Sequence, residues 1–313
     1  MHVVVLGGTK FVGRHIVAEL LSHGHRVTLF TRGQTAPDLF PEAEHLIGDR
    51  LGDVSALYER TYDAVVDVSA YVPRAVHTVA EALSGDPLYL FISTISVYDD
   101  PPAGSDETAS INQLDDPTTE VITAETYGGL KVLCENEVRA RYSRHVILRP
   151  GLIAGPYDPT DRFTYWAWRL NRPGPVPIPD RKSQPIQLID ARDLASFAVK
   201  ALEDGLQGEY NCAGPPSTMG AVINACGGSP TWLPAATFTE ANLEPWANLP
   251  LFTNFDDSGQ GMMQISSDKA LKAGLTYRPF EETAIDTIAW SKDMTSMKVG
   301  LTSEQEKTVL GLD

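Results

Sequence analysis

Apolar runs alternate with segments of helical period through the first half of the chain. Val3–Leu6 is a continuous apolar run, and a second strand is predicted at Val27–Thr31. Between them lie apolar residues at the spacing of one helix face, namely Ile16, Val17, Leu20 and Leu21. Gly24 can end that helix. The pattern therefore predicts a strand–helix–strand unit of about thirty residues.

The same alternation continues beyond this unit. The runs "YDAVVDVSA", "LYLFISTISVY" and "HVILRPGLIAGP" are predicted strands, and "RAVHTVAEALSG" is a predicted helix between the first two. Strands with little polar alternation, separated by helices, indicate a parallel sheet covered on both faces. With right-handed crossovers, the fold class is α/β, a doubly wound parallel Rossmann sheet with a smaller C-terminal α/β substrate domain.

The pattern loosens after about residue 156, where "NRPGPVPIPDRKSQP" is rich in proline and glycine. A helix in "ARDLASFAVKALED" and a strand in "EYNCAG" then return to the regular pattern. We therefore predict a dinucleotide-binding domain from residues 1–156, with returning segments at about 186–214. Residues 157–185 and 215–313 are predicted to form the substrate-binding region, which suits a chain of 313 residues.

The turn "GGTKFVG" between the first strand and helix resembles a phosphate-binding glycine turn. Gly7 allows the tight turn, Gly13 lets helix and strand approach, and the helix N-terminus offers N–H groups to a pyrophosphate. Lys10 stands where a middle glycine is usual. The predicted cofactor contacts in this turn are Gly7, Thr9, Lys10, Phe11, Val12 and Gly13.

The end of the second predicted strand lacks the acidic residue that binds the adenosine ribose of NAD. Thr31 and Arg32 stand there instead. A guanidinium can bind a 2′-phosphate through paired hydrogen bonds, whereas a carboxylate would repel it. We therefore predict NADP as the cofactor, with NAD less favoured, and Arg32 and Lys10 as its cationic contacts. The alternative is that both are ordinary solvated side chains.

The segment "TYGGLK" places Tyr127 and Lys131 four residues apart, on one face of a helix. An ammonium beside a phenol favours the phenolate, so we expect the pKa of Tyr127 to be lowered from its usual value near ~10. The strand "FISTISVY" ends at the carboxyl edge of the sheet, where such sheets bind ligands. Its hydroxyl residues are Ser93, Thr94 and Ser96.

Six segments together resemble the short-chain dehydrogenase/reductase superfamily, in its extended or atypical branch of epimerase/dehydratase-like proteins. These segments are "GGTKFVG", "GDR", "STISVY", "YGGLK", "LRPGLIAGP" and "RPFEETAIDTIAW". The resemblance implies that Tyr127 is the general acid/base and that Thr94 binds the substrate oxygen, with Ser96 as a reserve candidate. It implies that Lys131 lowers the pKa of Tyr127 and holds the nicotinamide ribose.

The resemblance also implies cofactor contacts from Asp49 to the adenine and from Leu152 and Ile153 to the carboxamide. One departure is Leu152, because sugar-nucleotide epimerases usually carry an asparagine there. The glycine turn most resembles that of the chloroplast stem-loop RNA-binding proteins. The segment "DPTDRFTYWAWRLNR" gathers four aromatic residues, Phe163, Tyr165, Trp166 and Trp168. These either line an apolar substrate site, with Trp166 as the candidate contact, or anchor the second domain. Trp232, Trp246 and Trp290 are predicted core residues.

Charge and composition exclude several classes of function. The chain has 25 basic and 41 acidic residues, a net charge of −16, which disfavours binding to nucleic acid or to an anionic membrane. Three cysteines without a CxxC pair predict neither a disulfide framework nor a metal site. No apolar run approaches the ~18 residues of a membrane span, so we expect a cytoplasmic monomer or homodimer acting on a small molecule.

These features favour an NADP(H)-dependent oxidoreductase that reduces a carbonyl, or oxidises an alcohol, on a small organic metabolite. One alternative is an epimerase or dehydratase that retains tightly bound NAD(P). The other is a non-catalytic dinucleotide-binding sensor or an RNA-associated protein. The Tyr127–Lys131 pair argues against the sensor, and the net charge argues against RNA.

Overall fold

The structure is a computed structural model that describes residues 1–253, 255 and 258–312. Its larger part is centred on a parallel sheet of seven strands, the last of which in sequence begins at Gly208. The strand order is β11-β6-β5-β4-β1-β2-β3, and every neighbouring pair is parallel. The strands are β1 (His2–Leu6), β2 (Arg26–Thr31), β3 (Glu44–Ile47), β4 (Ala64–Asp67), β5 (Leu88–Ile92), β6 (His145–Pro150) and β11 (Gly208–Cys212). The predicted doubly wound Rossmann sheet is confirmed.

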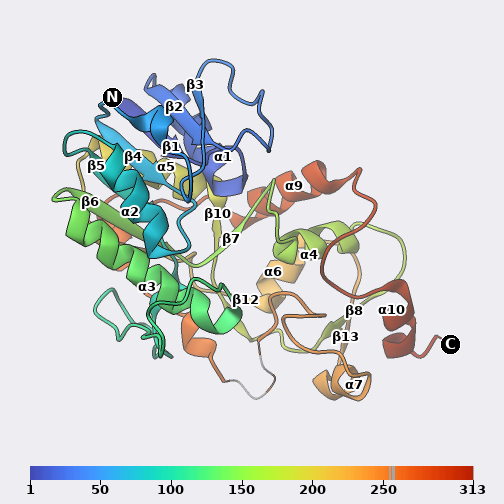
Figure 1. Cartoon of the computed structure of the whole chain (residues 1–313). Helices are drawn as coiled ribbons and strands as arrows, with labels where there is room; N and C mark the ends of the chain where they lie inside the picture. The colour runs from blue at the N-terminus through green and yellow to red at the C-terminus, as the bar shows by residue number, and fades with distance from the viewer. Residues whose placement is uncertain (254, 256–257, 313) are drawn as a thin grey trace.

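Two pairs of helices cover the two faces of this sheet. α1 (Phe11–Ser22) packs beside α5 (Ala191–Glu203), and α2 (Pro73–Ala82) packs beside α3 (Ala124–Arg141) (Figure 1). The position of β1 in the middle of the sheet explains its run of apolar residues. Val3 and Val5 belong to the core under one helix pair, while Val4 and Leu6 belong to the core under the other. Because both faces are buried, all four positions from Val3 to Leu6 are apolar, and only the half-buried first residue, His2, is polar.

The C-terminal segments build a second, smaller core, which lies towards the lower right in Figure 1. Its helices are α4 (Arg162–Leu170), α6 (Met219–Cys226), α7 (Ala235–Glu240), α9 (Phe280–Ser291) and α10 (Ser303–Leu310). Three short strand pairs accompany them. These are β7 (Leu152–Ala154) with β10 (Leu188–Asp190), β8 (Val176–Pro179) with β13 (Pro230–Leu233), and β9 (Pro185–Ile186) with β12 (Ser217–Thr218).

One C-terminal segment lies against the sheet and not in the second core. α8 (Asp268–Lys272) packs beside β11, and Ala270 and Leu275 join the core beneath α1 and α5. The sequence placed this segment in the substrate-binding region. The remaining domain limits stay predictions. Short 3-10 turns complete the description, namely η1 (Ser55–Leu57), η2 (Ile95–Val97) and η3 (Gln260–Met263).

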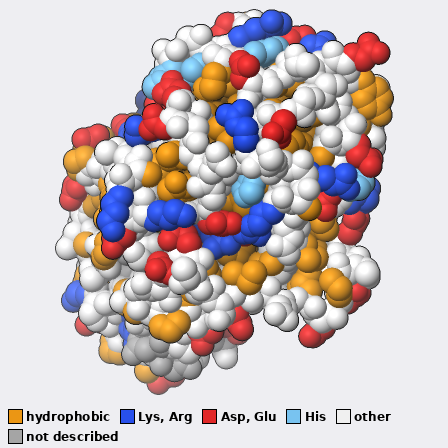
Figure 2. Space-filling view, turned by 90° about the vertical axis from the view of Figure 1, so that its left-hand side faces the viewer, with side chains coloured by type: hydrophobic (Ala, Val, Ile, Leu, Met, Phe, Trp, Pro, Cys, Tyr) orange, Lys and Arg blue, Asp and Glu red, His pale blue; other side chains and the backbone are white. Residues whose placement is uncertain are grey.

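The surface carries both signs of charge side by side. On the face shown in Figure 2, Lys and Arg side chains alternate with Asp and Glu across the middle of the molecule. Within the described part of the chain, no helix is both long enough and apolar enough to cross a membrane.

Candidate active site

The turn from β1 into α1 has the backbone geometry that glycine provides. Gly7 and Gly8 have φ of 108° and 98°, a region that residues with a Cβ rarely adopt. A Cβ at Gly13 would lie 2.9 Å from the Gly8 backbone, so the third glycine allows α1 to approach the turn. The structure thus agrees with the predicted reasons for Gly7 and Gly13, and adds Gly8, which the sequence argument did not single out.

Lys10 occupies the middle position of the turn without strain. Its backbone is extended, with φ of −126° and ψ of 144°, which any residue adopts. Lys10 is the N-cap of α1, and its side chain makes no capping hydrogen bond. The first N–H groups of α1 therefore have no side-chain cap from Lys10, and they point with the positive end of the helix dipole towards the space in front of the turn.

A cavity of about 530 Å³ lies in front of this turn. It opens at the carboxyl ends of β1, β2 and β4, where the strand order reverses, which is the usual ligand-binding place in such sheets. Eight predicted cofactor residues line it, namely Gly7, Thr9, Lys10, Phe11, Val12, Gly13, Arg32 and Asp49. Lys131, Leu152 and Ile153 lie outside its lining. The glycine turn, the uncapped helix and the cavity together fit a dinucleotide.

Two arginines border the cavity in different states. Arg50 forms a two-pronged ion pair with Asp67, with Nη–Oδ distances of 2.6 and 2.5 Å, and also donates to Ser69 Oγ at 2.9 Å. Arg32 is exposed at the rim, and its guanidinium has no hydrogen bond or ion pair with any described residue. Arg50 therefore holds the protein together, whereas Arg32 is available to a ligand.

A buried carboxylate at the end of β4 supports the floor of the cavity. Asp67 accepts hydrogen bonds from the Tyr89 hydroxyl at 2.6 Å and from the backbone N–H groups of Ser69 and Ala70. Burial by itself would raise the pKa of Asp67, but the charge of Arg50 and these hydrogen bonds lower it below its usual value. The carboxylate thus stays ionised and fixes the segment that follows β4.

The predicted catalytic residues meet where α3 approaches η2. Thr94 is the N-cap of η2, and its hydroxyl accepts from Ser96 N at 3.1 Å and donates to Ser96 Oγ at 3.2 Å. A Cβ at Gly128 would lie 2.1 Å from the Ser96 carbonyl oxygen, so only glycine permits this approach. The contact brings the half-buried Tyr127 close enough to Thr94 for the threonine hydroxyl to influence its ionisation.

The expected lowering of the Tyr127 pKa is wrong for this structure. The pKa of Tyr127 is raised to about 12, because burial disfavours the phenolate and the neighbouring Tyr71 adds to the effect. Thr94 and Arg162 oppose the rise without reversing it. Tyr127 is therefore protonated at neutral pH and is prepared to donate a proton.

Lys131 is buried on the inner side of this site, with 2% of its surface exposed. Its ammonium donates to Ala70 O at 2.9 Å and to Ile92 O at 2.8 Å, and lies 4.0 Å from the centre of the Phe91 ring. Burial lowers the pKa of Lys131 to about 8. An ammonium has three donors, so one remains for a ribose hydroxyl, and that contact stays a prediction.

Two residues that sequence reasoning missed complete the site. Tyr71 lines the cavity and lies 6.3 Å from Tyr127 between ring centres, so it connects the cavity to the phenol. Arg162, the first residue of α4, stacks on Trp246 with its guanidinium carbon 4.9 Å from the ring centre. Tyr71 could have been found from its place just beyond β4, at the carboxyl edge; nothing in the sequence pattern pointed to Arg162.

The remaining candidates divide between site and core. Ser96 stays beside Thr94, whereas Ser93 turns away and donates to Glu135 at 2.6 Å. Trp166 is fully buried in the second core and donates to Pro250 O at 2.7 Å, so its assignment as a substrate contact is corrected. The predicted core residue Trp246 is instead 38% exposed. Burial of the α4 aromatic residues favours the alternative that this helix anchors the second region.

Comparison with known proteins decides the family. The sequence model of the NAD dependent epimerase/dehydratase family matches residues 3–213, about two thirds of the chain. The chain belongs to this family. Its family is therefore the epimerase/dehydratase branch of the short-chain dehydrogenase/reductases, which is named for its dependence on NAD.

One curated relative of this family member is distant in sequence. The Arabidopsis thaliana protein named chloroplast stem-loop binding protein of 41 kDa b is 26% identical over 218 residues, 64% of this chain. The chain spans about half, 54%, of that relative.

Several solved structures share the fold over nearly the whole chain. A putative epimerase from Burkholderia cenocepacia has a TM-score of 0.68 at 20% identity, covering 92% of this chain and 97% of its own. A UDP-glucose 4-epimerase from Thermus thermophilus in complex with NAD has a TM-score of 0.65 at 18% identity, covering 94% and 100%. A UDP-glucuronic acid 4-epimerase from Bacillus cereus in complex with NAD has a TM-score of 0.68 at 17% identity, covering 94% and 98%.

Proposed function

We propose that this enzyme is an NADP(H)-dependent oxidoreductase that reduces a carbonyl group on a small organic metabolite. The observation that carries the cofactor choice is Arg32, a free guanidinium at the cavity rim where NAD-binding relatives of the fold place a carboxylate. Lys10 adds a second cation to the same lining. Asp49 is the carboxylate of the lining, and its Oδ1 accepts the backbone N–H of Leu51 at 3.0 Å.

The state of Tyr127 favours the direction of reduction. A reduced nicotinamide, when bound, supplies the hydride that adds to the carbonyl carbon. Tyr127, with its pKa raised to about 12, donates its proton to the carbonyl oxygen, and the product is an alcohol. The Thr94 hydroxyl donates a hydrogen bond to the same oxygen as negative charge develops there.

Arg162, on helix α4 of the second core, favours the binding of an anionic substrate. The Arg162 guanidinium makes no hydrogen bond or salt bridge with a described residue, but its charge acts on the buried Asp158 and on Tyr127, where it opposes the rise in pKa. Arg169, seven residues along the same helix, is instead paired with Glu306 at 2.6 Å. A free guanidinium beside an exposed indole can bind a carboxylate or phosphate of the substrate while the carbonyl faces Tyr127.

The test is oxidation of NADPH by the purified enzyme with a panel of aldehydes and ketones, each as an acid and as its neutral ester. Tyr127→Phe removes the transferable proton and little volume, so we expect turnover to fall by ~100-fold or more while NADPH still binds. Normal turnover by Tyr127→Phe would refute its role as the acid. Arg162→Gln should remove the preference for the acids; an unchanged preference would exclude Arg162 as the anion contact.

The second candidate follows from the name of the family. It is an epimerase or dehydratase that regenerates its cofactor in each cycle. Leu152 stands against this candidate, since sugar-nucleotide epimerases usually carry asparagine there. Native mass spectrometry of freshly purified enzyme separates the two. A retained dinucleotide supports the epimerase cycle, and an empty site supports the exchanging reductase.

Stem-loop binding, the property in the name of the Arabidopsis thaliana relative, does not suit this chain. A net charge of −16 and interspersed surface charges oppose contact with a phosphate backbone.

A further inference from the structure

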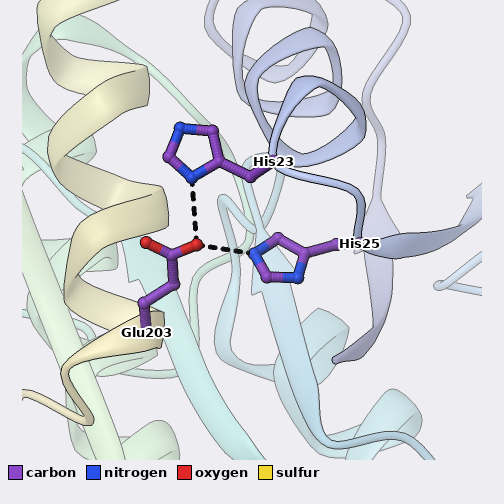
Figure 3. Close-up of side chains that lie close together, drawn as sticks. All are labelled: His23, His25 and Glu203. Atoms are coloured by element: carbon purple, nitrogen blue, oxygen red, sulfur yellow. Dashed lines mark hydrogen bonds and ion pairs between the residues drawn. The ribbon is translucent and has the colours of Figure 1, made fainter.

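Two histidines and a glutamate meet at the edge of the sheet opposite the active site. His23 ends α1, His25 directly precedes β2, and Glu203 is the last residue of α5. Figure 3 shows both imidazoles pointing at the same carboxylate, although nearly 180 residues separate it from them in sequence. The cofactor cavity lies at the other end of β2, so this cluster is separate from it.

The distances suit a shared metal ion. Glu203 Oε1 lies 3.0 Å from His23 Nδ1 and 2.9 Å from His25 Nε2. The three ligand atoms lie within 4.8 Å of one another. In a tetrahedral site with metal–ligand bonds of about 2.0–2.2 Å, ligand atoms are roughly 3.3–3.5 Å apart. To hold one ion, each imidazole has to move a few tenths of an ångström away from the carboxylate, and the two imidazole nitrogens have to come closer to each other than the 4.8 Å limit. The three side chains are exposed or half-buried, so they have room for these movements.

The chemistry of the set indicates zinc. Two imidazoles and one carboxylate are a known three-residue ligand set for Zn²⁺, with water in the fourth position. A ligating histidine usually has a carboxylate near its other ring nitrogen, which orients the ring. His23 Nε2 lies 3.6 Å from Glu19 Oε1, and Ser196 on α5 donates to that same oxygen at 2.7 Å. Glu19 thus lies on the side of His23 where a ligating histidine usually has a carboxylate, whereas Nδ1 of His25 faces the Met1 ammonium at 3.2 Å and leaves Nε2 towards the shared site.

A second histidine cluster on the surface shows the difference. His77 contacts the carboxylates of Glu81 and Glu137 at 3.1 and 3.0 Å, but it is a single imidazole. The Arg141 guanidinium lies against its Nδ1, so a cation already occupies the position that a metal would take. His77 is thus a surface ion-pair residue and a matched control.

We propose that His23, His25 and Glu203 form a Zn²⁺ site that ties the turn between α1 and β2 to the end of α5. The ion joins the two helices that cover one face of the sheet, so it stabilises the dinucleotide-binding half of the enzyme. The sequence prediction of no metal site rested on the cysteines and did not weigh these histidines.

The experiment uses the full chain with any affinity tag removed and with metal stripped by a chelator. Zn²⁺ alone is titrated by calorimetry, and melting is followed with and without the ion. We expect one Zn²⁺ per chain and a higher melting temperature when Zn²⁺ is present. His23→Gln, His25→Gln and Glu203→Gln should each weaken binding by at least tenfold, and Glu19→Gln by about tenfold.

His77→Gln should bind Zn²⁺ as the unmodified chain does. Binding of NADPH by each variant shows that its dinucleotide-binding half is folded, so a lost zinc signal reports on the ligands. The proposal is overturned if the stripped protein binds no Zn²⁺ at micromolar concentrations. It is equally overturned if the His23→Gln/His25→Gln double variant binds as tightly as the parent, since the cluster is then an ion pair only.

Discussion

Arg32→Ala should weaken NADPH binding and leave NADH binding almost unchanged. Arg32 directly follows the last residue of β2, is exposed at the cavity rim and has no partner among the described residues. Its removal therefore breaks no internal contact of the protein. Arg50 cannot replace it, because both of its terminal nitrogens are bound to Asp67.

The expected loss of NADPH affinity in Arg32→Ala follows from the position of Arg32. A hydrogen bond to a charged group contributes ~1.5–3 kcal/mol, and about 1.4 kcal/mol corresponds to a tenfold change in affinity. The range is therefore roughly 10- to 150-fold. Because the side chain is solvent-exposed and screened by salt, we expect a value near the lower limit, about tenfold, that shrinks as salt is added.

The assay is calorimetric titration of both dinucleotides at two salt concentrations. Arg26→Ala is the matched control, because Arg26 begins the same strand, is highly exposed and carries the same charge. At about 3.3 Å per residue it lies some 17 Å away from the rim. Equal losses for NADPH and NADH in Arg32→Ala, or an equal loss in Arg26→Ala, would refute a local contact with the 2′-phosphate.

Two further predictions concern the catalytic residues. Gly128→Ala places a Cβ 2.1 Å from the Ser96 carbonyl oxygen and should move Tyr127 enough to reduce turnover by ~100-fold. At Gly129 the nearest atoms to a new Cβ are Cγ and Cδ2 of Leu114, both at 2.5 Å, so Gly129→Ala requires this side chain to shift and should reduce turnover much less. Comparable turnover of the two variants would contradict the close approach. Burial lowers the pKa of Lys131 to about 8 in the folded protein, from 10.5 in the unfolded chain. Between these two pH values Lys131 is protonated in the unfolded chain and neutral in the folded protein, so the free energy of unfolding rises with pH. Urea unfolding at pH 7 and pH 10 should show the parent gaining up to about 3 kcal/mol relative to Lys131→Met, and parallel pH dependences would show that the buried ammonium does not titrate there.

The first strand–helix–strand unit could be predicted because its determinants are local. Val3, Val4 and Val5 are buried on both faces, so the sequence shows an uninterrupted apolar run. Gly7 and Gly13 are needed by the backbone of the same turn. Each of these constraints acts within about ten residues of chain. Periodicity and glycine spacing were therefore sufficient to predict the turn that borders the cavity.

The ionisation of Tyr127 could not be predicted in the same way. Helical spacing correctly places Lys131 on the same helix, but it does not show that the ammonium turns to the carbonyls of Ala70 and Ile92. Nor does it show that Tyr71 lies against the phenol. These neighbours come from the loop after β4 and from β5, and their effect on the pKa of Tyr127 depends on tertiary packing.

The aromatic residues of the second region show a related limit. Trp166 and Trp246 have the same side chain, yet one is fully buried and the other stacks against Arg162 at the surface. An indole has both an apolar body and a polar N–H, so it suits either place. Only the partner decides, and for Trp166 that partner is the carbonyl of Pro250, 84 residues away.

Salt-bridge partners also distinguish the arginines proposed to bind ligands from those that only stabilise the fold. With 41 acidic and 25 basic residues, the chain has enough carboxylates to pair its cations. Arg50 and Arg169 are paired in this way, with Asp67 and Glu306. Arg32 lines the cavity and Arg162 acts on Tyr127 by its charge, and neither forms a salt bridge within the described structure. A guanidinium without a salt bridge in so acidic a protein can bind an anionic ligand. In the proposed function, Arg32 therefore determines specificity for the cofactor phosphate, and Arg162 determines specificity for the substrate.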